Sequence, residues 1–203
     1  LSTEEDYSAA IYSKEDLIIN GNGTLNVNAG YRNGIKSTDD CIIVSGTLNI
    51  TSTEDGIIGK DLCGIVAGDI NINAGSDGVK STYDTDTTKG NVIIEGGNIT
   101  IKASNDGIQA ENILVINDGT INIKTNNGAA DTTQTHIDNM DMGRGGFGFN
   151  NNKTTTTTDD TSESRKGIKA GNMLIINDGD ITIDSDDDSV HCNSVIYIYM
   201  VVL

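Results

Sequence analysis

The sequence contains no proline and no tryptophan, and basic residues are scarce. Its 203 residues hold 13 Lys and Arg against 30 Asp and Glu, which gives a net charge of −17. Nucleic-acid phosphates demand Lys and Arg, so this balance argues against a nucleic-acid partner and favours cations. Much of the acidity also serves solubility, because a net charge far from zero keeps a protein dispersed.

Aromatic residues make up only 4% of the chain, and long apolar runs are absent. A flat stacking platform of the kind that would hold cellulose is therefore weakly supported, with Tyr12, Tyr31 and Tyr83 as scattered candidates. No stretch is long and apolar enough to span a membrane. The chain begins at Leu1 without a signal peptide, so we interpret it as a trimmed domain and infer secretion indirectly.

Glycine is abundant, with 24 residues, and its positions reveal a repeat. Gly34, Gly56 and Gly78 follow one another at intervals of 22 residues, and a second glycine series that includes Gly46 and Gly68 runs 12 residues behind. Periods of this length are typical of solenoids and propellers.

Within each unit the apolar residues alternate, as half-buried strands require. Aligned by their glycines, the units place Ile, Val and Leu in common inward columns, for example Ile35 above Ile57 and Val79. Each unit therefore contains three short strands, such as 34–37, 41–44 and 47–51. The sequence predicts an all-β, right-handed parallel β-helix with about 22 residues per coil.

We expect one domain over residues 1–203, with residues 1–9 as a lead-in. Seven additional residues within 83–90 should enlarge one turn so that it projects. Residues 129–165 lose the alternation and form a low-complexity excursion. Residues 196–203 do not reach the glycine that the repeat requires, which suggests a frameshifted or truncated last coil.

The three cysteines suggest core packing rather than chemistry. Cys41 and Cys63 occupy the same inward column on adjacent coils, and Cys192 takes a position where other coils have Ser or Ala. Parallel neighbours in register present their Cβ atoms side by side, which is a poor geometry for a disulfide. We expect free, buried thiols.

Acidic residues also stack in outward columns at the turns. Carboxylates about 5 Å apart repel one another unless they are protonated, paired or bridged by a cation. Ca²⁺ takes 6 to 8 oxygen ligands of this kind. The predicted calcium ligands are Asp39, Asp40, Glu54, Asp55, Asp61, Asp77, Asp84, Asp86, Asn105 and Asp106. The alternative is structural, because Asn and Asp tolerate turn backbones and bond them locally.

A catalytic site is less evident. The outward lysine column of Lys36, Lys80 and Lys169 can supply a general base only if a pKa is depressed, and such lysines are more often solvated counter-charges. Lys80 beside the enlarged turn is the best candidate. His136 and His191 do not form a transition-metal site, and the EF-hand motif is absent. We therefore interpret the calcium as structural.

The repeated Asp-Gly-Ile-[Lys/Gln]-[Ser/Ala] followed by Asn-Asp-Gly-[Thr/Asp]-Ile-[Asn/Thr]-Ile resembles the secreted clostridial carbohydrate-binding β-helix family, whose fold is similar to that of pectate lyases. The resemblance covers residues 10–195. It implies an extracellular or cell-surface bacterial domain that binds Ca²⁺ and acidic plant-wall polysaccharide, pectin or polygalacturonate, without established catalysis. The pectate-lyase comparison implies acidic Ca²⁺ ligands and a lysine base, the latter matched weakly by Lys36, Lys80 or Lys169.

Three functions therefore stay open. The first is a calcium-dependent, non-catalytic carbohydrate-binding module that acts as a monomer. The second is a calcium-dependent pectate lyase with Lys80 as the base, and the third is a cell-surface adhesin or scaffold that displays loops.

Overall fold

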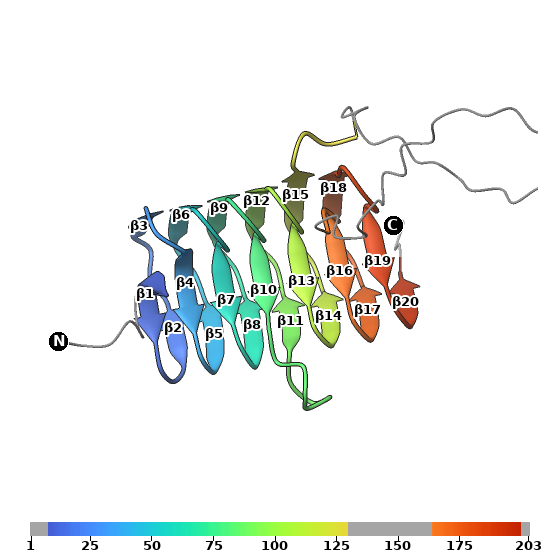
Figure 1. Cartoon of the computed structure of the whole chain (residues 1–203), viewed down its shortest axis with the longest axis horizontal. Helices are drawn as coiled ribbons and strands as arrows, with labels where there is room; N and C mark the ends of the chain where they lie inside the picture. The colour runs from blue at the N-terminus through green and yellow to red at the C-terminus, as the bar shows by residue number, and fades with distance from the viewer. Residues whose placement is uncertain (1–7, 130–163, 200–203) are drawn as a thin grey trace, which may run out of the picture.

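The computed structural model describes residues 8–129 and 164–199, and these form three parallel β-sheets wound into a solenoid. The coils stack along the long axis of the molecule (Figure 1). No helix long and apolar enough to cross a membrane occurs within the described ranges. The predicted all-β parallel β-helix with three strands per coil is confirmed.

The first sheet has seven strands: β1 (Ala9–Ser13), β4 (Asn33–Ser37), β7 (Ile57–Gly59), β10 (Val79–Ser81), β13 (Ile108–Ala110), β16 (Ile168–Ala170) and β19 (Val190–Cys192). The second sheet also has seven: β2 (Leu17–Ile19), β5 (Asp40–Ile43), β8 (Leu62–Ile65), β11 (Asn91–Ile94), β14 (Ile113–Ile116), β17 (Met173–Ile176) and β20 (Val195–Ile198). The third sheet has six: β3 (Thr24–Ala29), β6 (Thr47–Ser52), β9 (Asp69–Ala74), β12 (Asn98–Ala103), β15 (Thr120–Thr125) and β18 (Asp180–Asp184).

The core is a set of aliphatic ladders inside the coils. Ile35 pairs in register with Ile57, which pairs with Val79, and all three are fully buried. In β12 and β15 the outward neighbours face solvent, which is the alternation that the sequence predicts, whereas β7 is buried throughout and its outward Ile58 is 3% exposed. Burying these ladders is the main stabilising term, since each coil shields the apolar face of the next.

The coils approach so closely at the repeating glycine that no side chain fits there. A Cβ on Gly78 would lie 2.5 Å from the carbonyl oxygen of Gly107 on the following coil. The same carbonyl accepts the backbone N–H of Val79 at 3.0 Å. The 22-residue glycine series is therefore a consequence of coil-to-coil contact.

Three corners join the sheets. The first corner lies between the first and second sheets, for example at 38–39 and 60–61; the second lies between the second and third sheets, at 66–68 and 117–119; the third leads to the next coil, at 53–56 and 75–78. The turn 82–90 at the first corner projects from the solenoid between β10 and β11, as expected (Figure 1).

Several sequence expectations fall partly outside the described residues. The lead-in is described only from residue 8, and β1 already begins at Ala9. Of the excursion 129–165, residues 130–163 lie outside the description. β20 aligns Ile196 with Leu174 and Ile198 with Ile176, so the repeat register persists there, and residues 200–203 lie outside the described part.

Candidate functional site

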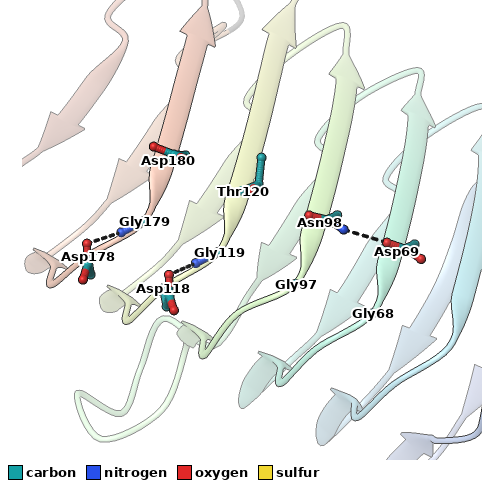
Figure 2. A pocket seen from close by; sticks show the side chains of 10 residues that line it. All are labelled: Gly68, Asp69, Gly97, Asn98, Asp118, Gly119, Thr120, Asp178, Gly179 and Asp180. Atoms are coloured by element: carbon teal, nitrogen blue, oxygen red, sulfur yellow. Dashed lines mark hydrogen bonds between the residues drawn. The ribbon is translucent and has the colours of Figure 1, made fainter.

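A groove of about 540 Å³ runs along the second corner, across successive coils. Its floor is backbone at the corner glycines, among them Gly68 and Gly119, which both have φ of +122°. A side chain is strained at such angles, so the repeat keeps glycine there and the floor stays free of side chains. Figure 2 shows the polar side chains that line it: Asp69, Asn98, Asp118, Thr120, Asp178 and Asp180.

Local hydrogen bonds orient several of these side chains (Figure 2). The carboxylate of Asp118 accepts the N–H of Gly119 at 2.6 Å, and that of Asp178 accepts the N–H of Gly179 at 2.9 Å. Asn98 Nδ2 donates to Asp69 Oδ1 at 2.9 Å. Each carboxylate keeps further lone pairs toward the groove, which therefore presents hydrogen-bond acceptors and negative charge.

A second acidic group lies at the first corner. One carboxylate oxygen from each of Asp16, Asp39 and Asp40 lies within 4.8 Å of the others. Burial and the charge of Asp16 raise the pKa of Asp40. A side-chain hydrogen bond with Asp61, and then burial, raise the pKa of Asp39. Crowded carboxylates of this kind have the hard oxygen chemistry that Ca²⁺ prefers.

Asp61 continues this corner but already has a cation. It is 8% exposed, and Lys89 from the projecting turn forms an ion pair with its Oδ2. The same position on the next coil is Gly90, so the acidic column ends at Asp61. The coil after that has Asn112 at this position. The turn 82–90 thus supplies the charge that neutralises Asp61.

The third corner holds a ladder of aspartates that bonds one coil to the next. Asp55 Oδ1 accepts the N–H of Asp77 at 3.0 Å, and Asp77 Oδ1 accepts the N–H of Asp106 at 2.9 Å. Two of these aspartates also pair with lysines through Oδ2: Asp77 with Lys80 at 2.6 Å and Asp106 with Lys169 at 3.1 Å. Asp106 Oδ1 accepts the backbone N–H of Lys166 at 2.7 Å. The oxygens of Asp77 and Asp106 therefore already have partners within the chain.

The same pairing bears on the lysine base. Asp77 and further carboxylates raise the pKa of Lys80, against the lowering effect of burial. A general base at neutral pH needs the opposite shift, so the condition that the sequence analysis set for Lys80 is not met. The lysine acts here as a counter-charge.

The remaining predicted ligands do not gather into a site. Asp84 is exposed on the projecting turn, where Asp86 accepts hydrogen bonds from the backbone and hydroxyl of Thr88. Asn105 donates to the Ser76 hydroxyl at 3.3 Å, and Glu54 is exposed at the third corner.

The cysteines and tyrosines lie away from the groove. Cys41 and Cys63 are free, fully buried and paired in register, and Cys192 is free and half-buried. Tyr31 is 63% exposed beside Arg32, and Tyr83 lies beneath two lysines of the first corner. No aromatic residue lines the groove among the described positions.

The sequence reasoning missed both the groove and Asp16. The groove has a sequence signal, because Asn-Asp-Gly-[Thr/Asp] places an aspartate immediately before a corner glycine at Asp118 and again at Asp178. Asp16 occupies the position of Asp40 one coil earlier, since Leu17 pairs with Cys41. Extending the Asp40 column by one coil would have found it.

Three comparisons identify what this chain is similar to. A family model described as carbohydrate-binding domain-containing protein matches residues 1–200. A carbohydrate-binding domain-containing protein of Acetivibrio thermocellus is 44% identical over 43 residues, which is 21% of this chain and 15% of that protein.

The solved structure of a polysaccharide lyase-like protein from C. thermocellum, in its gadolinium derivative, superposes with a TM-score of 0.63 at 24% identity. The superposition covers 97% of this chain and 55% of that protein, so the two share a fold. This chain spans only part of the length of each relative. The expected resemblance to a clostridial carbohydrate-binding family is confirmed. The chain belongs to the family of carbohydrate-binding domain-containing proteins.

Proposed function

We propose that this domain binds polysaccharide along the groove of the second corner, outside the cell or at its surface. The observation that carries the proposal is the groove itself, an open channel over several coils with a side-chain-free floor and polar walls. A linear polymer can lie along such a channel and exchange hydrogen bonds with each coil in turn. Membership of a carbohydrate-binding family supports this assignment.

The polymer is proposed to be an acidic plant-wall polysaccharide such as polygalacturonate, bound with Ca²⁺. The groove walls carry Asp69, Asp118, Asp178 and Asp180, so a uronate polymer would be repelled without a bridging cation. Ca²⁺ binds carboxylates, amides and carbonyls, which both the groove and the polymer offer.

A resident Ca²⁺ is proposed at the first corner, held by Asp16, Asp39 and Asp40. The donor set fits, because three carboxylates lie within 4.8 Å and the pKa values of Asp39 and Asp40 are raised. An ion there would neutralise crowded charge and stabilise the folded chain by mass action. Its role in this proposal is structural.

Lyase activity has less support. Lyase chemistry needs a base that removes a proton beside the uronate carboxylate, and the ion pair with Asp77 keeps Lys80 protonated. Lys80 also belongs to the first sheet and does not line the groove. An adhesin or scaffold is the remaining alternative, and it requires neither sugar nor Ca²⁺.

The test is a pull-down on polygalacturonate in Ca²⁺ and in EDTA, with the double variant Asp118→Asn, Asp178→Asn. Asparagine keeps an acceptor for the corner N–H and removes the charge, so the fold should persist. We expect much stronger binding in Ca²⁺ than in EDTA, and the binding in Ca²⁺ should be weakened about tenfold or more in the double variant. Asp84→Asn, an exposed aspartate on the projecting turn, is the matched control and should bind normally.

Three results would contradict this proposal. If the double variant binds as tightly as the natural sequence, the groove is not the binding surface. If the natural sequence does not bind at all, the adhesin or scaffold is favoured. Release of unsaturated product from polygalacturonate, lost in Lys80→Ala, would establish a lyase.

A further inference from the structure

A second hollow lies on the outer face of the third sheet, away from the floor of the groove. It has a volume of about 260 Å³ and runs across β6, β9 and β12 between two rows of outward side chains. Asn49, Asn71 and Thr100 pair in register as one row. Thr51, Asn73 and Lys102 pair in register as the other. We refer to this hollow between the two rows as the trough.

The first row is held in place by a ladder of side-chain amides. Asn49 Nδ2 donates to Asn26 Oδ1 at 2.8 Å, and Asn71 Nδ2 donates to Asn49 Oδ1 at 3.1 Å. Each bond fixes the amide plane and uses one N–H, so the second N–H of each amide stays available to a ligand. The wall is therefore ordered before a ligand arrives, which lowers the entropy lost on binding.

The second row is exposed and makes no such bonds among the described residues. The side chains of Thr51, Asn73 and Lys102 have no hydrogen bond or ion pair with any residue in 8–129 or 164–199. Lys124, the neighbour of Lys102 on β15, contrasts with it, since it pairs with Asp184 at 2.9 Å. The Lys102 ammonium is therefore open to an anionic ligand, on a face where its neighbour Lys124 is already paired.

The trough also differs from the groove in charge. No carboxylate lines it, whereas four aspartates line the groove. Its lining combines amides, hydroxyls and one ammonium. That set matches a ligand rich in hydroxyl groups that carries one negative group, because amides and hydroxyls exchange hydrogen bonds with hydroxyls and the ammonium bonds a carboxylate.

We infer that the trough is a metal-independent subsite for a uronate unit, with Lys102 paired to the sugar carboxylate. The inference rests on the proposed polysaccharide binding and refines its specificity. The two surfaces would then bind the polymer in different ways. The acidic groove needs Ca²⁺ to hold an acidic polymer, whereas the trough holds one acidic unit directly. The apolar lining that the threonine methyl groups and lysine stem provide can meet the C–H face of the ring.

The test measures binding of trigalacturonate and of its methyl ester by calorimetry in EDTA, so that Ca²⁺ plays no part. We expect Lys102→Gln to weaken trigalacturonate binding about tenfold or more, the scale of a lost charge-assisted hydrogen bond. Asn73→Asp, which brings a carboxylate next to Lys102, should weaken it similarly. The methyl ester should bind less tightly and be insensitive to Lys102→Gln.

Lys14→Gln is the matched control, since Lys14 is also exposed and unpaired in the described chain but lies at the first corner. It should leave trigalacturonate binding unchanged, and both lysine variants should keep the thermal midpoint of the natural sequence. If Lys102→Gln binds trigalacturonate as tightly as the natural sequence does, the inference is overturned.

A second outcome separates this inference from the proposed function. If polygalacturonate binds in Ca²⁺ but trigalacturonate does not bind in EDTA, the trough is excluded and the groove proposal stands. If neither ligand binds under either condition, both are overturned.

Discussion

Replacing Asp77 tests whether the third-corner ladder is structural. Asp77 is 4% exposed, accepts the N–H of Asp106 through Oδ1 at 2.9 Å, and pairs with Lys80 through Oδ2 at 2.6 Å. Asp77→Ala leaves the N–H of Asp106, a residue that is 1% exposed, without an acceptor.

The expected size of the effect follows from these contacts. An unsatisfied buried backbone N–H costs about 1–3 kcal/mol. Lys80 is 23% exposed and can turn toward water, so loss of the ion pair adds only about 1 kcal/mol. Asp77→Ala should therefore lower the free energy of unfolding by about 3 kcal/mol, or the thermal midpoint by roughly 6 to 12 °C in a chain of this length.

Asp77→Asn is the informative companion. Its amide oxygen still accepts the Asp106 N–H, and only the charge facing Lys80 is lost, so its cost should stay near 1 kcal/mol or below. Thermal and urea unfolding followed by circular dichroism would measure both variants, with and without EDTA. Both Asp77 variants should lose as much stability in EDTA as the natural sequence does, because the oxygens of Asp77 already have partners in the chain.

Equal destabilisation by Asn and Ala would show that the ion pair, and not the backbone acceptor, supports this corner. Loss of the EDTA effect in Asp77→Asn would instead make Asp77 a calcium ligand, and the structural account of the ladder would be refuted.

Three further predictions concern single positions. Raised pKa values at Asp39 and Asp40 mean that the folded chain holds these protons more tightly than the unfolded chain, so without Ca²⁺ stability falls as pH rises above about 4. Asp39→Asn should therefore be more stable than the natural sequence at pH 7 in EDTA, with the advantage shrinking toward pH 4; urea midpoints that do not converge at low pH would contradict this. Gly78→Ala should impair folding because its Cβ would lie 2.5 Å from the Gly107 oxygen, whereas Gly64→Ala, with nothing nearer than 3.6 Å, should be tolerated; similar melting curves for the two would contradict the close-contact account. Burial raises the pKa of Cys41 to about 12, so iodoacetamide should label the half-buried Cys192 first and Cys41 only on unfolding. Mass spectrometry of the cysteine-containing peptides would measure the order of labelling.

The solenoid was predictable because its signal is periodic and local. The alternation of Ile99, Thr100 and Ile101 identifies which side chains face inward, and the glycine interval aligns one coil with the next. Strand bounds such as β6 (Thr47–Ser52) differ from the expected 47–51 by a single residue.

The site was less predictable because periodicity says which way a side chain points but not what it meets. The sequence placed Asp61 and Asp77 alike in acidic columns, yet one pairs with Lys89 across 28 residues and the other with Lys80 across three. Lys89 comes from the seven-residue enlargement, whose path no repeat pattern specifies. The groove runs over backbone at corner glycines such as Gly119, and nothing in the composition specifies that successive corners form one hollow.

The corner glycines also make the molecule extensible. Since each coil meets its neighbours through the same backbone contact, one more 22-residue unit of the Asp106–Asn127 type would add about 4.8 Å of length and leave the cross-section unchanged. If the groove binds a sugar polymer as proposed, its length and the number of sugar units in contact would scale with coil number. In such an architecture, ligand size is tuned by duplication of whole units rather than by substitution at individual positions.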